Sequence, residues 1–198
     1  MLESSCLSRL TVAVAQQDDT AAEAAVLGLN PTDEPALLLW LTATDPERRW
    51  WAMRPLAACG GSLAAAAIAS QLETGDPQLR GVAAFALGHL HQRVPEAVNP
   101  HLAGLANRLS DNDGSVRQAA ADALALCGDD AVATLATVLA SEDQAARTRA
   151  AYALRKIASP GAATILFRCL NDTNYMVHTY AYEGLDELGL LDNLLVIP

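Results

Sequence analysis

Three histidines near the middle of the chain have the side-chain type that could hold a metal ion. His89 and His91 form a His-x-His pair, and His101 follows in the same region. Such a pair binds a metal ion when a third ligand completes the site. Glu96 is the nearest acid, and the histidines lack the i, i+4 spacing of a helical metal site. We therefore expect surface histidines and no metal, with a metal site as the alternative.

The cysteines and the paired carboxylates offer little further chemistry. No Cys-x-x-Cys pair occurs among Cys6, Cys59, Cys127 and Cys169. We expect buried free thiols, with a bilin-linking or metal-binding thiol as the alternative. The pairs Asp129-Asp130 and Asp186-Glu187 fall at expected turns or helix ends, where solvation explains them. Because no Gly-rich phosphate loop, Gly-x-Ser-x-Gly elbow or His-Glu-x-x-His is present, we expect no catalytic residues and no cofactor.

Composition and charge narrow the classes of partner. The 198 residues carry a formal net charge of -10, and only 13 are Lys or Arg. Nucleic acids and anionic membranes are bound through many Lys and Arg side chains, so both are disfavoured. A partner with a basic or mixed surface fits better. No apolar run approaches the roughly 20 residues of a transmembrane helix, and Glu3 stands where a signal peptide would be basic. We therefore expect a cytoplasmic protein.

One pattern recurs along the chain and predicts its architecture. An acid is followed four residues later by Arg, and Ala, Leu and a last apolar residue follow that Arg at offsets 3, 7 and 10. These offsets lie on one face of an α-helix, and the acid stands at the expected N-cap. The acids and arginines are Asp45 and Arg49, Asp76 and Arg80, Asp113 and Arg117, and Asp143 and Arg147. The last copy has Asn174 and His178 instead.

A second helix fits between successive copies of the pattern. Its expected ranges are 62–74, 96–110, 130–141 and 160–171. The longest step between copies has extra residues near 91–98, which we expect to form a long loop. Pro55 should kink its helix unless that helix ends early. The 40 alanines also favour an all-α fold, because alanine is the best helix former.

The pattern resembles HEAT repeats, in the short form found in phycobilisome-lyase-like proteins, over residues 35–189. This resemblance implies about five two-helix units stacked into a right-handed α-α superhelix, a HEAT/armadillo-type solenoid. It implies that the helix with the acid and Arg lines the concave face, and that the four Asp and Arg pairs form a structural ladder between units. Deoxyhypusine hydroxylases use similar repeats with iron-binding His-Glu dipeptides. This chain has no such dipeptide, which argues against a di-iron hydroxylase.

The two ends of the chain fall outside the repeats. Residues 1–34 should form an N-terminal helical cap, with short helices near 4–16 and 19–28. Residues 190–198 are apolar and follow Gly189, a typical helix C-cap residue. We expect this C-terminal tail to cover the last unit, with docking to a partner as the alternative. The whole chain is expected to be one structural domain.

A stripe of aromatic and charged residues lies opposite the predicted core. Offsets 1, 5 and 8 from each repeat Arg are on the helix face opposite offsets 3, 7 and 10. The aromatic stripe is defined here as seven side chains at these offsets: Trp50, Arg54, Phe85, Asp122, Tyr152, Arg155 and Glu183. Aromatic rings and arginines dominate the energetics of protein interfaces, so the stripe is the predicted binding surface. The alternative is packing of its rings against the N-terminal cap or a long loop.

These observations favour a non-catalytic HEAT-repeat binding module or scaffold that holds a protein partner on its concave face. The resemblance also allows an enzyme, since a bilin lyase or another chromophore-handling protein of the phycobilisome-lyase-like family would have the same repeats. No cofactor is expected for the first function.

Overall fold

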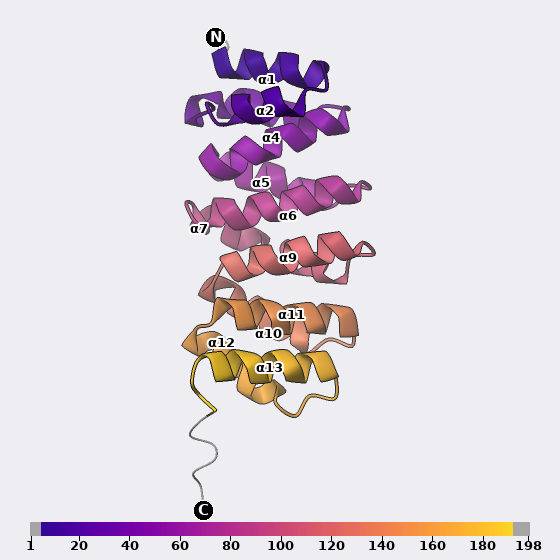
Figure 1. Ribbon diagram of the computed structural model, residues 1–198, viewed down its shortest axis with the longest axis vertical. Coiled ribbons are helices and arrows are strands. Elements are labelled where there is room, and N and C mark those ends of the chain that lie inside the picture. The colour runs from indigo at the N-terminus through magenta and orange to yellow at the C-terminus, as the bar shows by residue number, and fades with distance from the viewer. Residues whose placement is uncertain (1–4, 192–198) are drawn as a thin grey trace, which may run out of the picture. The chain divides into compact units, whose positions relative to one another are not determined.

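The chain is helical throughout the part that the structure describes, residues 5–191. The computed structural model contains α-helices and short 3-10 helices, and no strand over this range (Figure 1). Contacts divide the chain into two compact units, Met1–His101 and Leu102–Pro198. None of the described helices is long and apolar enough to cross a membrane. The all-α class is confirmed, whereas a single domain stays a prediction.

Unit 1 opens with the two helices that were expected in the N-terminal cap. Its elements are α1 (Ser5–Ala15), α2 (Asp19–Val26), η1 (Pro31–Asp33), α3 (Glu34–Leu41), α4 (Pro46–Cys59), α5 (Ser62–Gln71), α6 (Pro77–His91), α7 (Pro95–Val98) and η2 (Asn99–His101). Helix α1 packs on α2, and both contact α4. The cap is therefore attached to the first helix that carries the repeat pattern.

Aspartate and proline start the two long helices of unit 1. Asp45 Oδ1 accepts a hydrogen bond from the Glu47 N–H over 2.9 Å, and Asp76 Oδ1 accepts one from the Gln78 N–H over 2.8 Å. Proline occupies the first helical position of both α4 and α6, where a missing N–H costs no hydrogen bond. Helix α4 continues through Pro55 to Cys59, so the helix does not end early.

The long loop expected near residues 91–98 is wrong. This segment contains α7, which starts at Pro95 and leads directly into η2. The Val98 side chain is fully buried, and His91 Nε2 lies 3.0 Å from Asn99 Oδ1. These contacts fold the extra residues onto α6 as a helical turn. Between residues 95 and 110 the predicted helix becomes four short pieces, one of which contains Pro100.

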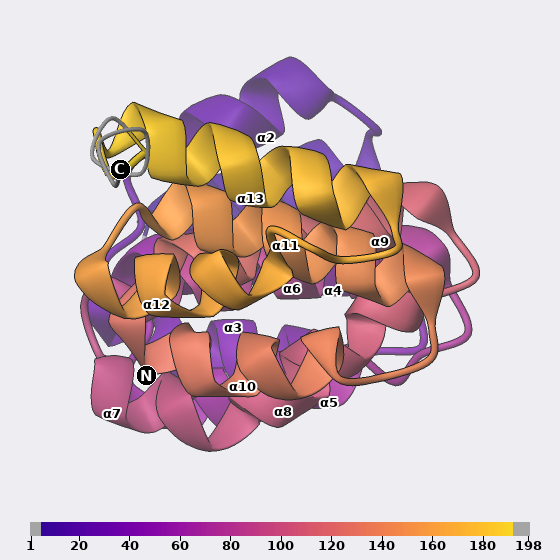
Figure 2. The same ribbon diagram turned by 90° about the horizontal axis from the view of Figure 1, so that it is seen from below.

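In unit 2, helices that carry the repeat pattern alternate with the second helices that lie between its copies. Its elements are α8 (Leu102–Asn107), η3 (Arg108–Ser110), α9 (Gly114–Leu126), α10 (Asp129–Leu139), α11 (Gln144–Ile157), α12 (Pro160–Cys169) and α13 (Tyr175–Glu187). Helices α9, α11 and α13 pack beside one another in one layer, and α8, α10 and α12 form the other (Figure 2). Each helix of the first layer starts immediately after the acid or Asn174 of the repeat pattern. Of the expected tail, residues 190–198, the part from 192 to 198 lies outside the described residues.

Alanine and leucine build the core at the predicted offsets. The offset-3 residues are fully buried, and they are Ala52, Ala83, Ala120, Ala150 and Ala181. The offset-7 residues are also fully buried, and they are Leu56, Leu87, Leu124, Leu154 and Leu185. The small alanines allow neighbouring helices to approach closely, and the leucines fill the space between the layers. The repeat pattern therefore marks the core face of each helix in its layer.

Candidate functional site

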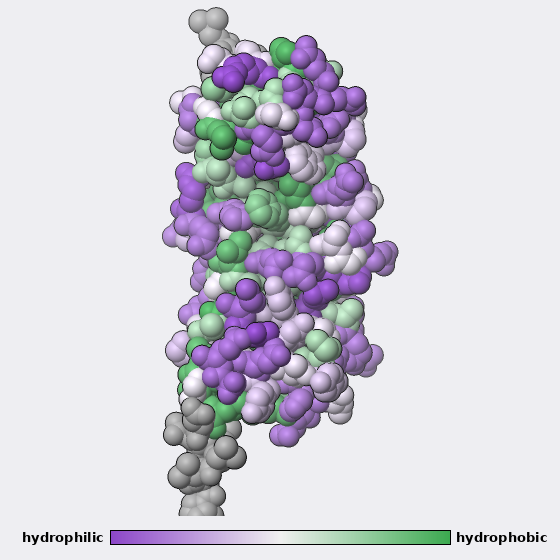
Figure 3. Space-filling view, viewed as in Figure 1, coloured by the Kyte–Doolittle hydropathy of each residue, from purple (hydrophilic) through white to green (hydrophobic). Residues whose placement is uncertain are grey.

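All seven side chains of the aromatic stripe reach the surface. Phe85 is 50% exposed, Asp122 is exposed, and the other five are half-buried. Unit 1 holds Trp50 and Arg54 on α4 and Phe85 on α6, and unit 2 holds Asp122 on α9, Tyr152 and Arg155 on α11, and Glu183 on α13. Hydrophobic surface lies over α6 with hydrophilic residues around it (Figure 3). Each unit therefore carries one part of the stripe.

In unit 2 a hydrogen-bonded network fixes the aromatic member of the stripe. The Tyr152 hydroxyl donates to Asp122 Oδ1 over 2.9 Å, and Gln118 Nε2 donates to Asp122 Oδ2 over 3.0 Å. The Tyr152 ring meets the ring of Tyr180 edge-on, with centroids 5.7 Å apart. Burial, followed by the hydrogen bond to the Asp122 carboxylate, raises the pKa of Tyr152. The sequence pattern missed Tyr180, because it lies at offset 2 of the last repeat.

Arg155 is balanced by two glutamates of α13. Arg155 Nη1 lies 2.6 Å from Glu183 Oε2, and Arg155 Nε donates to Glu187 Oε1 over 3.1 Å. The hydrogen bond with Glu187 raises the pKa of the Arg155 guanidinium and lowers the pKa of the Glu187 carboxyl. A partner in contact with this part of the stripe would therefore meet a compensated ion pair.

In unit 1 the N-terminal cap binds one member of the stripe. Arg54 Nη1 lies 2.5 Å from Glu23 Oε1 of α2. The Arg54 guanidinium also lies over two indole rings, 5.1 Å from the centroid of Trp50 and 5.7 Å from that of Trp51. The two rings meet edge-on with centroids 4.9 Å apart. The N-terminal cap therefore contacts the stripe through Arg54, and packing of the stripe's rings against the cap stays an untested alternative.

A pocket opens beside these tryptophans, entirely within unit 1. Its volume is about 390 Å³. It is lined by Asp19 and Glu23 of α2, by Pro46, Glu47, Trp50 and Trp51 of α4, and by Asp76, Gln78 and Leu79 at the start of α6. Trp50 is the only member of the aromatic stripe among these lining residues. The sequence pattern gave Asp76 only as a ladder residue and missed Asp19, Glu23, Glu47 and Trp51, because nothing local indicates that three helices meet there.

Phe85 carries the exposed apolar surface of α6. Its ring lies 4.2 Å from the ring of His89, centroid to centroid, at an interplanar angle of 47°. His89 is exposed, whereas Gly88 is buried. The exposed residues of α6 therefore lie at offsets 5 and 9 from Arg80. The predicted offset 8 is buried, so the exposed face ends one residue later than expected.

The ladder aspartates cap their own helices, and two of the ladder arginines bind the turns that precede theirs. Each ladder aspartate accepts hydrogen bonds from backbone N–H groups in the first turn of its own helix. Arg80 Nη1 donates to the Thr74 carbonyl over 2.9 Å, and Arg117 Nη1 donates to the Asp111 carbonyl over 2.6 Å. Both carbonyls belong to the turn that precedes the helix of the arginine. These arginines therefore secure the turns between helices.

Electrostatic coupling between repeats is nevertheless visible at Asp143. A hydrogen bond from the Ser110 hydroxyl is the largest cause that lowers the pKa of Asp143, followed by contacts with backbone N–H groups. The positive charge of Arg117 in the preceding repeat adds a smaller lowering. The ladder itself stays a prediction.

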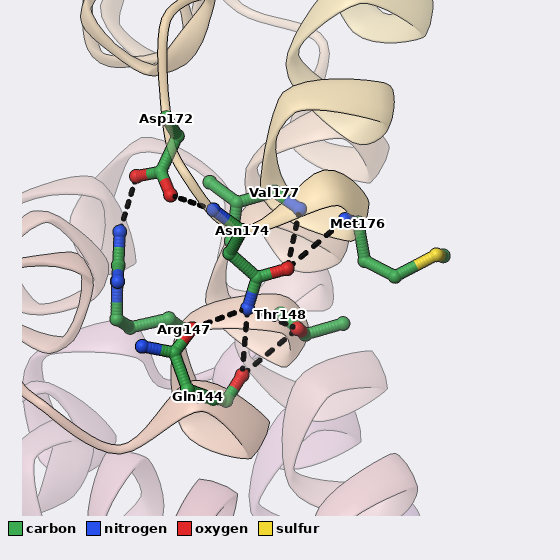
Figure 4. A network of polar contacts seen from close by, with 7 residues as sticks. All are labelled: Gln144, Arg147, Thr148, Asp172, Asn174, Met176 and Val177. Carbon is green, nitrogen blue, oxygen red and sulfur yellow. Dashed lines mark hydrogen bonds and ion pairs between the residues drawn. The ribbon is translucent and has the colours of Figure 1, made fainter.

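The last repeat is joined to its neighbour through Asn174 and Asp172 (Figure 4). Asn174 Oδ1 accepts hydrogen bonds from the N–H groups that start α13, and its Nδ2 donates to Gln144 Oε1 over 2.7 Å. Asp172 pairs with Arg147 and accepts the Asn174 N–H over 2.8 Å. His178 replaces the repeat arginine, and its Nδ1 lies 2.7 Å from the Leu170 carbonyl oxygen. At the substituted positions, Asn174 therefore contacts α11 and His178 contacts the end of α12.

The cysteines and histidines form no metal cluster within residues 5–191. Burial raises the pKa of Cys59 and Cys169, and it raises the pKa of Cys127 to about 12. All four cysteines are free. His91 is buried, so the expectation of a surface histidine is wrong there.

The sequence and the fold both match known repeat proteins. Residues 102–186 match the HEAT repeats family. An engineered protein is 24% identical with a TM-score of 0.51, and the alignment covers 91% of this chain and 95% of that chain. The complex of CpcE and CpcF of phycocyanin lyase from Nostoc is 23% identical with a TM-score of 0.58, and the alignment covers 74% of this chain and 98% of that chain.

A designed armadillo repeat protein in complex with the peptide (KR)4 is 16% identical with a TM-score of 0.51, covering 93% of this chain and 100% of that chain. No curated protein sequence matches the chain. These likenesses show the HEAT/armadillo-type fold and agree with the resemblance to phycobilisome-lyase-like repeats. Residues 102–186 therefore resemble HEAT repeats in sequence, and the fold of the chain is of the HEAT/armadillo type.

Proposed function

We propose that this protein is a non-catalytic scaffold that holds a protein partner on its concave face, through the aromatic stripe. The observation that carries the proposal is Phe85. Its ring is half exposed on a helix whose leucines are buried, and it lies beside the exposed ring of His89. An exposed aromatic ring supplies apolar contact area at low entropic cost, because it has few rotatable bonds.

The net charge of -10 favours a partner with a basic or mixed surface. A designed armadillo protein of the same fold class was captured with a basic peptide, (KR)4, which supports this choice of partner. We propose a cytoplasmic location, and neither nucleic acid nor a membrane as ligand.

The test is affinity capture from the native lysate with wild type and two single variants, followed by mass spectrometry. Phe85→Ala should abolish capture of the specific partner without lowering the melting temperature. Phe167→Ala is the matched control, because Phe167 is an exposed phenylalanine on α12 of unit 2 and is not part of the aromatic stripe. Capture that survives Phe85→Ala, or that is lost equally in both variants, would reject the proposal.

A bilin lyase or chromophore-handling protein is the second candidate. The fold likeness to the phycocyanin lyase complex from Nostoc favours it. Purified protein incubated with a linear tetrapyrrole should then show a shift in the absorbance of the pigment. A solution without any shift would remove this candidate.

A further inference from the structure

The pocket between α2, α4 and α6 combines negative charge with aromatic rings. We propose that it binds the guanidinium group of an arginine side chain in a basic segment of the partner. The inference rests on the proposed scaffold function and names the chemistry that one part of the surface recognises. Its volume of about 390 Å³ lies within the range of roughly 300–1,000 Å³ of small-molecule sites, so it can hold a whole side chain.

Charge is the first argument for a cationic occupant. Four carboxylates line the pocket, from Asp19, Glu23, Glu47 and Asp76, and its lining residues, all of them in the described part of the chain, include no basic side chain. Glu23 is paired with Arg54 outside the lining. Three carboxylates, from α2, α4 and the N-cap of α6, therefore remain around one cavity, and a cation is the charge that they attract.

The tryptophans are the second argument. A cation is attracted to the negative face of an indole ring, and tryptophan is the best aromatic partner for it. Trp50 is half-buried at the pocket wall, and the buried Trp51 supports it edge-on. An occupant of the pocket therefore meets a ring whose position is already fixed.

Arg54 shows which cation this wall accommodates. Its guanidinium lies over both indole rings while it pairs with Glu23. A second guanidinium that enters the pocket would find the same two kinds of partner, an indole ring and the carboxylates of Asp19, Glu47 and Asp76. Arginine suits such a site better than lysine, because its planar group stacks on rings, forms forked hydrogen bonds to carboxylates and is more weakly hydrated.

Helix capping alone does not explain the pocket. Asp19 and Glu47 lie in the first turns of α2 and α4, and Asp76 is the N-cap of α6. Negative charge stabilises each of these helix ends separately. Capping gives no reason, however, for the three helix ends to converge on a cavity that is also lined by Trp50 and Trp51.

The test uses the full chain and a fluorescein-labelled octapeptide of alternating arginine and serine. Binding is measured by fluorescence anisotropy at about 0.15 M salt, where the Debye length of about 8 Å screens distant charges. Otherwise identical peptides carry lysine or the neutral arginine analogue citrulline. We expect the arginine peptide to bind at least about fivefold more tightly than the lysine peptide, and the citrulline peptide to show no binding.

Two variants test the site itself. Glu47→Gln should weaken binding of the arginine peptide about tenfold, because it removes one charge-assisted contact. Glu142→Gln removes the same charge from an exposed position in unit 2 and should leave binding unchanged within about twofold. Circular dichroism of both variants should equal that of wild type, since both side chains are exposed. The melting temperature of Glu47→Gln should fall by no more than about 4 °C, because the variant loses the charge that stabilises the start of α4.

Equal loss in the two variants, no loss in either, or equal binding of the lysine peptide would overturn the inference in favour of general attraction to an acidic protein. The scaffold proposal is tested separately by Phe85→Ala. If Phe85→Ala abolishes partner capture while the arginine peptide fails to bind, the scaffold function stands and the pocket assignment falls.

Discussion

Replacing Asn174 by aspartate separates two roles that this side chain combines. Asn174 Oδ1 caps α13 by accepting from the Met176 N–H over 2.9 Å and from the Val177 N–H over 3.3 Å. Its Nδ2 donates to Gln144 Oε1 on α11 over 2.7 Å. Asn174→Asp keeps the acceptor for the cap and removes the donor. It also places a carboxylate oxygen beside the Gln144 backbone carbonyl, which accepts from Asn174 Nδ2 over 3.4 Å and cannot become a donor, so the contact between the two repeats is weakened.

The expected cost follows from the contacts. A hydrogen bond of this kind contributes about 0.5–1.5 kcal/mol, and the new charge at the helix N-terminus returns about 0.3–1 kcal/mol. Repulsion between the carboxylate and the Gln144 backbone carbonyl oxygen opposes that gain, so Asn174→Asp should lower the free energy of unfolding by about 1 kcal/mol. Asn174→Ala loses the cap as well, typically about 1 kcal/mol, and should cost about 2 kcal/mol. These costs correspond to about 2–4 °C in Tm per kcal/mol for a protein of this size.

Urea unfolding followed by far-ultraviolet circular dichroism measures both variants. The matched control is Asp113→Asn, the opposite exchange at the equivalent cap of α9, where the amide oxygen can still accept from the Ser115 N–H. It should change the stability by no more than about 0.5 kcal/mol, since asparagine and aspartate are similar N-caps. If Asn174→Asp is as stable as wild type, or as unstable as Asn174→Ala, the two roles are not those assigned here.

Gly128 has φ +60° and ψ −139° at the start of α10, a conformation that other residues strongly avoid, so Gly128→Ala should destabilise by about 1–3 kcal/mol in urea unfolding. Gly81→Ala is its control in α6, where an added Cβ meets nothing within 4 Å, and a gain of about 0.5–1 kcal/mol is expected; equal effects of the two changes would contradict this reading. Asp172→Ala should cost about 2–3 kcal/mol in the same assay, because it leaves the Arg147 guanidinium largely buried without its partner, and a loss below about 0.5 kcal/mol would show that the pair contributes little. Because burial raises the pKa of Cys127 to about 12, the folded protein keeps this thiol protonated while the unfolded chain ionises it near pH 8.5. The stability from Cys127 is therefore present below about pH 8.5 and is lost as pH rises toward 12, by about 2 kcal/mol at pH 10; a wild type whose pH profile equals that of Cys127→Ala would refute it.

Local signals in the sequence were sufficient to place the repeat helices. The acids at positions 45, 76, 113 and 143 predict the starts of α4, α6, α9 and α11, because an N-cap acts on the backbone two or three residues away. Offsets 3 and 7 predict the buried alanines and leucines, because the helix period alone decides which residues share a face. The fold class and the exposure of Phe85 therefore follow from the sequence.

Contacts between helices were decided only by the tertiary structure. Nothing near Arg54 indicates that its partner is Glu23 of the N-terminal cap, and nothing near Asn174 indicates Gln144. The segment at 91–98 forms a helical turn because Val98 is buried where α7 packs on α6. The pocket at Trp50 exists because the ends of α2, α4 and α6 converge. The sequence period determines the face of each helix, whereas the residues that meet across two helices depend on how far the helices slide and rotate against each other, which packing of the whole core decides.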